Sequence, residues 1–494
     1  LWVTVKGVGL TSDSTIYLST ARSLLEGRGF FAFGEPMTQY PPVYPLLLAA
    51  VGKFNPDITV TARWLHAFLY GLNGALFMYL AYTSTRRSPF ALFAAGILYF
   101  SNEFMLDIHA YAWSESPFIT FLLLTLFFLT RYVMSQRLNW MYLTAASLAL
   151  AAVTRYVGIT LLPAALIIFW IFSELKPKQK IRYALVFGGI SVLPLAAWMM
   201  RNLVVAKTAA NRVVAYHPVD ADGYHDLISS LHNYFLPSTV TWWNNFFELT
   251  VVIIVFGLFA YKLFKLYKPG EKTESELITL VLTGLIGSGI YLVFLLISMT
   301  YIDAMTRFNY RILSPVFILL SLSAISIMFG YSTKAKNNAV WAVFLLTVLI
   351  IGRANTGSTV DAAFFKRANG LGLNGEIFHN SPLLQKFPQV DNNITIYSNG
   401  YREIGFLSDR VTVTLPQKYD AMSRVENLLY ESQMAAMCSH ARSGEALIVT
   451  FRLLGKWDIY PTEDEIDITC DIPILYDEYD GLIFGIKDKF SITP

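Results

Sequence analysis

Charged residues are scarce in this sequence of 494 residues: Asp, Glu, Lys and Arg make up 15% of it, against 54% hydrophobic residues. Soluble globular domains carry about 25% charged residues, so the composition excludes an ordinary soluble protein. The formal net charge is only +3, and no basic run alternates with aromatic residues, which excludes a nucleic-acid partner. The composition indicates a polytopic α-helical membrane protein.

Sequence motifs of common enzyme sites are also missing. No Walker loop, H-E-x-x-H motif or Cys/His metal spacing is present. Three histidines, His217, His225 and His232, are separated by eight and seven residues, which does not suit a compact metal site. No cofactor is therefore indicated, and a divalent metal has no support. The stretch "GLGLNG" (370–375) matches a dinucleotide-binding pattern, but it follows a helix-like segment, so we predict a glycine-rich connector.

Only two cysteines are present, Cys438 and Cys470, and both fall in the last quarter of the sequence. If this part lies outside the cytoplasm, they can form one disulfide. Two buried free thiols are the alternative.

Apolar stretches long enough, or nearly long enough, to cross a bilayer of about 30 Å follow one another along most of the chain. They lie near 58–83, 88–104, 116–134, 139–153, 157–173, 183–200, 248–266, 277–300, 312–331 and 339–353. The opening residues, "LWVTVKGVGL", resemble the outer end of a helix, and we expect a further transmembrane segment before them.

Basic residues occur in alternate loops between these stretches, and the positive-inside rule assigns those loops to the cytoplasm. They are Arg86, Arg87, Arg131, Arg137, Lys176, Lys178, Lys180, Arg182, Lys262, Lys265, Lys268, Lys272, Lys334 and Lys336. The opening stretch, the loops between, and the C-terminal part are then extracytoplasmic. We expect a multi-pass protein of the plasma (inner) membrane with its functional residues on the outer side. In the outer loop 201–246 we expect an interfacial helix with aromatic anchors.

The pattern changes from about residue 354. Short β-rich runs such as "NITIYS", "VTVTLP", "EALIVTF" and "GLIFGI" alternate with helical stretches such as "MSRVENLLYESQMAAMCSHA". We therefore predict two domains: residues 1–353 form the transmembrane domain, and residues 354–494 form an extracytoplasmic α/β domain.

The stretch "GLTSDSTIYLSTARSLLEGRGF" (9–30) places Asp13 beside a predicted amphipathic helix. One stripe of this helix is apolar and the other polar, which predicts a helix lying along the membrane surface. The apolar residues are Ile16, Leu18, Ala21, Leu24 and Leu25, and the polar ones are Ser19, Arg22 and Glu26. Asp13 then lies at the outer membrane boundary. It either caps the helix, since "SDS" is typical of a helix start, or takes part in chemistry.

Several motifs together resemble one family. "SDSTIYLSTARSLLEGRGF", "TQYPPVYPLLLA", "HAYAWSESPFITFLLLTLFFLTRY" and "VTRYVGITLLPAAL" resemble the GT-C glycosyltransferases that use polyprenyl-phosphate sugars. That group includes the bacterial aminoarabinose transferase and the protein O-mannosyltransferases. The resemblance extends to about residue 320, and "ITIYSNGYREIGFLSDR" is similar to the C-terminal domain of many bacterial members.

The resemblance implies a GT-C-like fold and a mannosyltransferase-like glycosyltransferase of the cell envelope. Its partners would be membrane lipid, a polyprenyl-phosphate sugar as donor, and a protein, lipid or glycan as acceptor. In that family the first outer loop carries an acidic residue at the active site, and Asp13 matches it. Tyr40 stands where several relatives have a lysine before the double proline, and its hydroxyl can still donate a hydrogen bond to phosphate.

The chemistry of sugar transfer from a lipid phosphate agrees with this resemblance. It needs a base, stabilisation of a cationic oxocarbenium-like transition state, and cations for the departing phosphate. Asp13 is the best candidate base. Glu115 can steady the sugar or the acceptor, and Asp107 competes with it for that role. The alternative for Glu115 is a favourable position in the first turn of the following helix.

Four arginines at outer ends of the apolar stretches are candidates for the phosphate, because a guanidinium binds phosphate oxygens in a two-pronged geometry. They are Arg155, Arg201, Arg307 and Arg311. The alternative for each is a side chain that extends to the membrane interface.

Two other functions fit a multi-pass protein of this kind. One is a GT-C-like accessory subunit of a membrane complex that has lost activity. The other is a transporter, which is disfavoured because the ionisable residues gather at the outer ends of the apolar stretches and not at the midplane.

Overall fold

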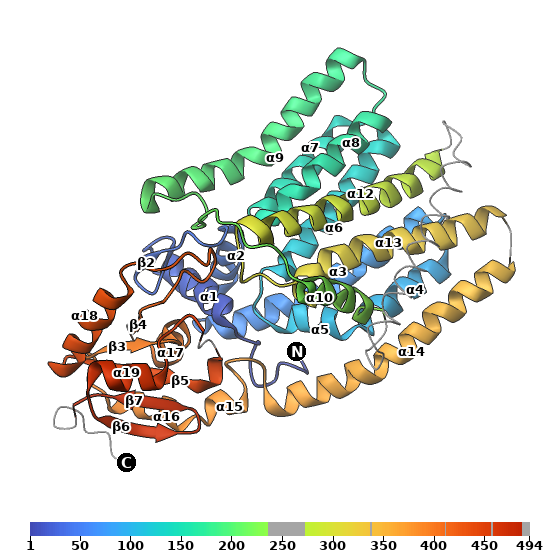
Figure 1. The fold of residues 1–494 in the computed structure, drawn as a ribbon. Coiled ribbons are helices and arrows are strands. Elements are labelled where there is room, and N and C mark those ends of the chain that lie inside the picture. Colours follow the sequence, from blue (N-terminus) through green and yellow to red (C-terminus); the bar gives the residue numbers. More distant parts are fainter. Residues whose placement is uncertain (236–271, 336–337, 411, 456–457, 487–494) are drawn as a thin grey trace.

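A computed structural model describes residues 1–235, 272–335, 338–410, 412–455 and 458–486. A bundle of helices forms the larger part of the molecule, and a smaller α/β domain built on a sheet follows it (Figure 1). The predicted fold class, a polytopic helical protein with a C-terminal α/β domain, is confirmed.

The helical part is made of α1 (Ser12–Leu25), α2 (Val43–Gly52), α3 (Ile58–Ser84), α4 (Pro89–Phe100), α5 (Glu103–Ala110), α6 (Glu115–Ser135), α7 (Leu138–Ala152), the 3-10 helix η1 (Tyr156–Thr160), α8 (Leu161–Phe172), α9 (Pro177–Ala206), α10 (Ala221–Asn233), α12 (Lys272–Tyr301), α13 (Tyr310–Ala335) and α14 (Asn338–Asn369). A small hairpin, β1 (Phe31–Ala32) and β2 (Glu35–Pro36), follows α1. One apolar core joins most of these helices, with Phe77, Phe118, Phe169 and Phe317 fully buried in it, whereas α1 and α2 share a separate apolar cluster.

Four helices in the described residues are long and apolar enough to cross a membrane: α6, α9, α12 over Ser275–Tyr301, and α13 over Tyr310–Gly330. The pair α4 and α5, bent by 62°, is a fifth if it counts as one span. The chain is thus a multi-pass membrane protein, but with fewer full-length spans in its described part than the ten predicted stretches. The stretch 248–266 lies outside the described residues.

The difference arises partly from polarity, because α3 has 27 residues but is not among the helices apolar enough to span a membrane, and partly from helix length. Helix α7 and the joined helices η1 and α8 are apolar but have at most 17 residues, and 17 residues extend only about 26 Å at 1.5 Å per residue. The apolar stretch near 88–104 is broken in the structure, because α4 ends at Phe100 and the Asn102 side chain caps the new helix α5. Likewise, the stretch near 157–173 begins as a 3-10 helix and becomes α-helical only at Leu161.

Helix α1 forms as the sequence predicted, and it is packed on more than one side. It packs against α2 on one side and the C-terminal domain on another, and Ser14, Thr15, Thr20 and Ser23 are buried together with its apolar residues. Two of these hydroxyls are satisfied inside the helix, because Thr15 donates to the Ser12 carbonyl at 2.8 Å and Thr20 to the Ile16 carbonyl at 2.7 Å. A hydroxyl satisfied in this way can be buried at little cost.

The segment before α1 fixes its position. The Gly9 amide donates to the Ala110 carbonyl, and the Ala112 amide donates to the Gly9 carbonyl, both at 2.8 Å. On its other side, the Leu373 amide donates to the Leu10 carbonyl at 2.9 Å. Gly9 lies so close to Tyr111 that an added Cβ would be 2.5 Å from the ring. The start of α1 is therefore held against the start of α6.

The glycine-rich stretch 370–375 contributes to this contact. It connects α14 to the short helix α15 (Glu376–His379), as predicted for a connector, and no strand leads into it. Helix α14 continues past residue 353, so the change from helices to strands comes after Asn369 rather than near 354.

The C-terminal domain is an α/β unit around a five-stranded sheet of order β4-β3-β5-β7-β6. The strands are β3 (Thr395–Ser398), β4 (Thr412–Thr414), β5 (Ala446–Phe451), β6 (Ile474–Glu478) and β7 (Gly481–Phe484), and the other helices are α16 (Pro382–Lys386), η2 (Phe387–Gln389), α17 (Tyr401–Ser408), α18 (Tyr430–Arg442), η3 (Arg452–Leu454) and α19 (Glu463–Cys470). Strand β3 is parallel to both β4 and β5, whereas β7 is antiparallel to β5 and β6. Each of the four β-rich runs in the sequence contains one of these strands.

The predicted helix over "MSRVENLLYESQMAAMCSHA" is shorter in the structure. Only α18, from Tyr430, is helical, because the Asp420 side chain accepts hydrogen bonds from the amides of Met422 and Ser423 and stabilises a turn. Arg424 then adopts a positive φ of 56°, which interrupts any helix at that point.

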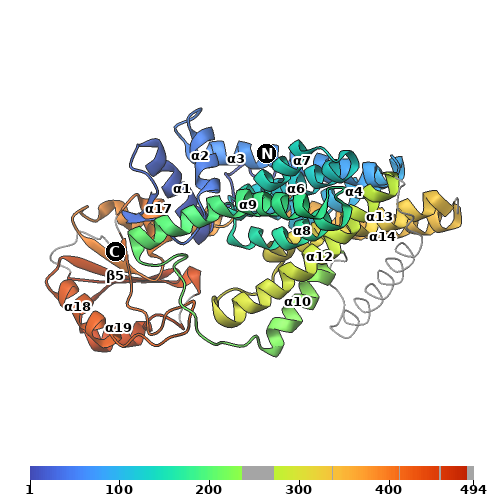
Figure 2. The ribbon, with the colours of Figure 1, turned by 90° about the horizontal axis from the view of Figure 1, so that it is seen from above.

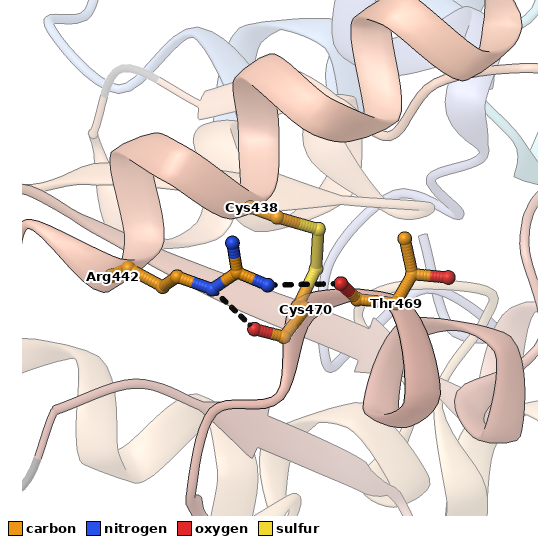
Figure 3. Close-up of a disulfide and its surroundings, with 4 residues drawn as sticks. All are labelled: Cys438, Arg442, Thr469 and Cys470. Atoms are coloured by element: carbon orange, nitrogen blue, oxygen red, sulfur yellow. Dashed lines mark hydrogen bonds between the residues drawn. A yellow bond between two sulfur atoms is a disulfide. The ribbon is translucent and has the colours of Figure 1, made fainter.

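A disulfide joins Cys438 of α18 to Cys470 at the end of α19 (Figure 3). Beside it, the Arg442 guanidinium donates hydrogen bonds to the carbonyls of Cys470 at 2.7 Å and Thr469 at 3.0 Å. The arginine thus satisfies carbonyls at the end of α19 that have no partner within the helix. Of the two states that the sequence left open for the cysteines, the structure has the disulfide.

Candidate active site

The beginnings of four helices meet at one place. Asp13 is the second residue of α1, Glu115 the first of α6, and Arg311 the second of α13, while Arg155 directly precedes η1. Helix beginnings carry a partial positive charge, so the two carboxylates are favourably placed there. The sequence separates these four residues by up to about 300 positions, and only the packing of the helices brings them together.

Arg311 is the centre of this group. Its guanidinium forms an ion pair with Asp13 Oδ2 at 2.7 Å, and it binds both carboxylate oxygens of Glu115, one through Nε and the other at 3.3 Å. The guanidinium also stacks over the Trp113 ring, 4.4 Å from its centre. A guanidinium held by two carboxylates and a ring face has little freedom to move.

Glu115 is the most deeply buried member, with 1% of its side chain exposed. It pairs with Arg155 as well as with Arg311, and Arg155 also donates to the Ser114 hydroxyl at 3.2 Å. A carboxylate this buried is stable as an anion only when cations and donors surround it. The series Asp13, Arg311, Glu115 and Arg155, which we call the charge network, therefore alternates in sign and has no formal net charge.

Asp13 has a second partner besides Arg311. The Tyr40 hydroxyl donates to Asp13 Oδ1 at 2.6 Å. Burial alone would raise the pKa of the Asp13 carboxyl, but the charge of Arg311 and the hydrogen bond from Tyr40 together hold this pKa below its ordinary value. The pKa of Tyr40 is raised well above its ordinary value, first by burial and then by the negative charge of Asp13. Asp13 is therefore ionised and Tyr40 protonated at neutral pH.

The capping explanation of Asp13 is not supported by this geometry. Thr11 occupies the cap position of α1, and the Asp13 side chain contacts Tyr40 and Arg311 instead of a helix amide. Glu115, by contrast, combines both explanations offered for it, because it begins α6 and also binds two arginines.

Three of the predicted site residues are not part of the charge network. Arg201 donates to the carbonyls of Met37 at 2.6 Å and Phe30 at 3.3 Å, which holds the β1–β2 hairpin. Asp107 pairs with Lys366 of α14 at 2.6 Å. Arg307 is exposed and forms no ion pair with any residue in the described ranges.

Other residues of the site were not singled out from the sequence. Trp113 and Ser114 directly precede Glu115 in "WSES", so their position beside a candidate site residue could have identified them. Tyr17 lies one turn after Asp13 on α1, and its hydroxyl is 3.2 Å from the Ser114 hydroxyl. Its ring packs at 4.8 Å from that of Tyr40. For a metal, no group of three or more His, Cys, Asp or Glu side chains is arranged to bind one within the residues that the structure describes.

Comparisons with known proteins agree with the resemblance of the motifs. Residues 27–195 match the family described as "Dolichyl-phosphate-mannose-protein mannosyltransferase". An "Uncharacterized protein" from Aquifex aeolicus (strain VF5) is 27% identical over 191 residues, which is 38% of this chain and 38% of that protein.

Among solved structures, ArnT from Cupriavidus metallidurans bound to undecaprenyl phosphate matches with a TM-score of 0.56 and 10% identity, over 98% of this chain and 95% of that one. ArnT from the same organism in the apo state matches with a TM-score of 0.55 and 12% identity, over 98% of this chain and 94% of that one. The chain therefore shares the fold of ArnT. The resemblance inferred from the motifs is confirmed at this level.

Proposed function

We propose that this protein is an integral-membrane glycosyltransferase that moves a sugar from a polyprenyl-phosphate donor to an extracytoplasmic acceptor, with Asp13 as the general base. The observation that carries the proposal is the charge network at the meeting of four helix beginnings. The GT-C fold and the mannosyltransferase family match over 27–195 support the reaction class. The relative solved with undecaprenyl phosphate supports the class of lipid.

In the proposed reaction the acceptor hydroxyl attacks the anomeric carbon while the bond from that carbon to the phosphate oxygen breaks. The hydroxyl proton goes to the Asp13 carboxylate, and the polyprenyl phosphate leaves as an anion. Arg311 and Arg155 bind its oxygens. Glu115 serves as a positioning residue, because it fixes both guanidinium groups from behind.

The lowered pKa of Asp13 has a consequence for the order of events. An ionised carboxylate with a low pKa binds a hydroxyl well but is a weak base. A donor phosphate that competes for Arg311 weakens the pair between Arg311 and Asp13, which raises the basicity of Asp13. Donor binding thus prepares the base, and the proton moves late, after the sugar has gained positive charge.

The disulfide supports the extracytoplasmic side of the proposal. Disulfides persist in oxidising compartments and are rare in the cytosol, and Cys438 and Cys470 are bonded in the C-terminal domain. This agrees with the alternation of basic loops, and both features support an extracytoplasmic location of the site.

The test uses the purified full chain with a panel of undecaprenyl-phosphate-linked sugars. Envelope extract from cells that lack the protein serves as the source of acceptors. Release of undecaprenyl phosphate by the wild-type protein supports the proposal. The Asp13→Asn variant should then lose at least about a hundredfold in rate, the range of general-base catalysis, while it still binds undecaprenyl phosphate.

Asp57→Asn is the matched control. Asp57 caps α3 by accepting from the Thr59 amide at 2.8 Å and takes no part in the charge network, so its rate should remain near that of the wild type. Near-parental transfer by Asp13→Asn would refute the role of Asp13. A wild-type protein that turns over no donor would favour the accessory-subunit alternative.

A further inference from the structure

Helix α17 of the C-terminal domain lies directly beside α1, as both views of the ribbon show (Figures 1 and 2). The Arg22 guanidinium of α1 stacks over the Phe406 ring of α17 at 4.7 Å. A second contact joins the same domain to the loop before α13, where the Ala304 amide donates to the Met422 carbonyl at 2.7 Å. The domain is thus held against the two helices that carry Asp13 and Arg311.

Arg402, the second residue of α17, extends from this domain toward the site. Its guanidinium donates to the Gln39 side-chain oxygen at 3.3 Å, and Gln39 precedes Tyr40, the hydrogen-bond donor to Asp13. The positive charge of Arg402 acts on the Tyr40 hydroxyl and opposes the effect of Asp13 on it. Arg402 is therefore a charged group that the C-terminal domain contributes to this side of the charge network.

The charge of Arg402 is not balanced by an ion pair. It forms none with a carboxylate anywhere in the described part of the chain, and its partners there are the neutral amide of Gln39 and the ring of Tyr401, 5.2 Å from the guanidinium. Burial lowers the pKa of Arg402, but Tyr401, Tyr40 and the charge of the adjacent Glu403 raise it above its ordinary value. A partly buried guanidinium whose hydrogen-bond acceptors are neutral is best satisfied by an anion.

The sheet topology gives an independent reason to expect a ligand at this position. From β3 the chain passes through α17 to β4 on one side, and the strand on the other side of β3 is β5, also parallel. Strand order reverses at β3, and open α/β sheets bind ligands beyond the carboxyl ends of the strands at such a reversal. Arg402 is four residues beyond the end of β3 and faces the helical domain there.

We propose that Arg402 binds the phosphate of the lipid donor, so that the C-terminal domain completes the donor site. This inference rests on the proposed function. The charge network alone has no formal net charge, whereas with Arg402 the site has one positive charge in excess, which the phosphate would balance. Arg402 would hold the phosphate from the side opposite the membrane helices.

The experiment measures binding of undecaprenyl phosphate to the purified full chain in lipid nanodiscs. Undecaprenol, the same chain without the phosphate, reports the contribution of the hydrocarbon. Arg402→Gln should weaken undecaprenyl phosphate binding by about tenfold or more, the usual loss for a hydrogen bond to a charged group, and leave undecaprenol binding unchanged. Arg402→Lys should recover part of the loss, since it restores the charge without the two-pronged geometry.

The control is Gln39→Ala, which removes the contact between Arg402 and the helical domain but keeps the charge. It should bind undecaprenyl phosphate within about twofold of the wild type. Equal losses in Gln39→Ala and Arg402→Gln would mean that domain contact, and not the charge, governs binding, which overturns the inference. Unchanged binding by Arg402→Gln also overturns it. Wild-type protein that fails to distinguish undecaprenyl phosphate from undecaprenol would instead defeat the proposed function itself.

Discussion

Arg311 and Glu115 should be strongly coupled in stability, and this coupling tests the charge network without any knowledge of the substrate. Arg311→Gln leaves Glu115, which is 1% exposed, with Arg155 as its remaining cation, and leaves Asp13 with Tyr40 alone. Removal of one partner of a buried pair destabilises a protein by about 3 to 5 kcal/mol. Since Arg155 still pairs with Glu115, we expect about 2 to 3 kcal/mol for this variant.

Glu115→Gln should destabilise by a similar amount, because it leaves Arg155 without a carboxylate partner. In the double variant the bond between the two residues is lost only once. The sum of the two single destabilisations should therefore exceed the destabilisation of the double variant by about 1 to 2 kcal/mol, within the range found for residues in one network. The measurement is the free energy of unfolding of all four proteins in mild detergent titrated with SDS.

A matched pair in the C-terminal domain provides the comparison. Arg452 and Glu463 are bonded at 2.6 Å, but their side chains are 32% and 24% exposed, so their coupling should be below about 1 kcal/mol. Additivity within about 0.5 kcal/mol for Arg311 and Glu115 would refute the network as a coupled unit.

Three further predictions follow from other parts of the molecule. The pKa of Asp13 lies below its ordinary 3.8 in the folded protein, so its stabilising contribution is present at neutral pH and lost only as the pH falls below about 4. The difference in unfolding free energy between wild type and Asp13→Asn should therefore stay constant from about pH 8 to pH 5. A decrease of this difference within that range would contradict the assignment. The disulfide closes a loop with a sequence separation of 32. The double change of Cys438 and Cys470 to Ala should therefore lower the free energy of unfolding of the C-terminal domain by about 3 to 4 kcal/mol, because the unfolded chain gains loop entropy. The measurement compares the unfolding of the oxidised wild type with that of the variant. Cysteines introduced at the exposed positions Arg28 and Ser432 should react with an impermeant thiol reagent in intact cells, whereas one at Lys178 should react only after the membrane is opened; the reverse pattern would overturn the assigned sides.

Local sequence patterns predicted the helices and strands better than they predicted which other parts of the protein these elements contact. The β-rich runs in the tail contain the strands β3, β4, β5 and β7, because short runs rich in β-branched and apolar residues are typical of strands, whether they alternate in burial as β3 does or are buried throughout as β5 and β7 are. The order of those strands depends on crossovers that no local pattern contains. Helix α1 was predicted from its sequence, but its contact with α17, which lies almost 400 residues later in the chain, could not be.

In the candidate site, too, the sequence indicated individual residues but not their partners. Asp13, Glu115, Arg155 and Arg311 were identifiable because charged residues at the ends of apolar stretches are few and need a reason. Arg201 and Asp107 satisfied the same criterion, yet their partners are backbone carbonyls and a lysine of α14. Sequence position can indicate that an ionisable group is held at a membrane boundary, but the partner that holds it is decided by packing.

Arg402 could not have been identified from its local sequence, since "GYREIG" reads as an ordinary helix start. Its interest comes from the contact of α17 with α1, which leaves a guanidinium beside Gln39 with no carboxylate partner among the described residues. A paired arginine, such as Arg452 with Glu463, is explained by its own domain. An arginine without such a pair, turned toward a site of alternating charges in another domain, is the feature from which we infer a phosphate held by both domains. On this proposal the C-terminal domain contributes directly to donor binding.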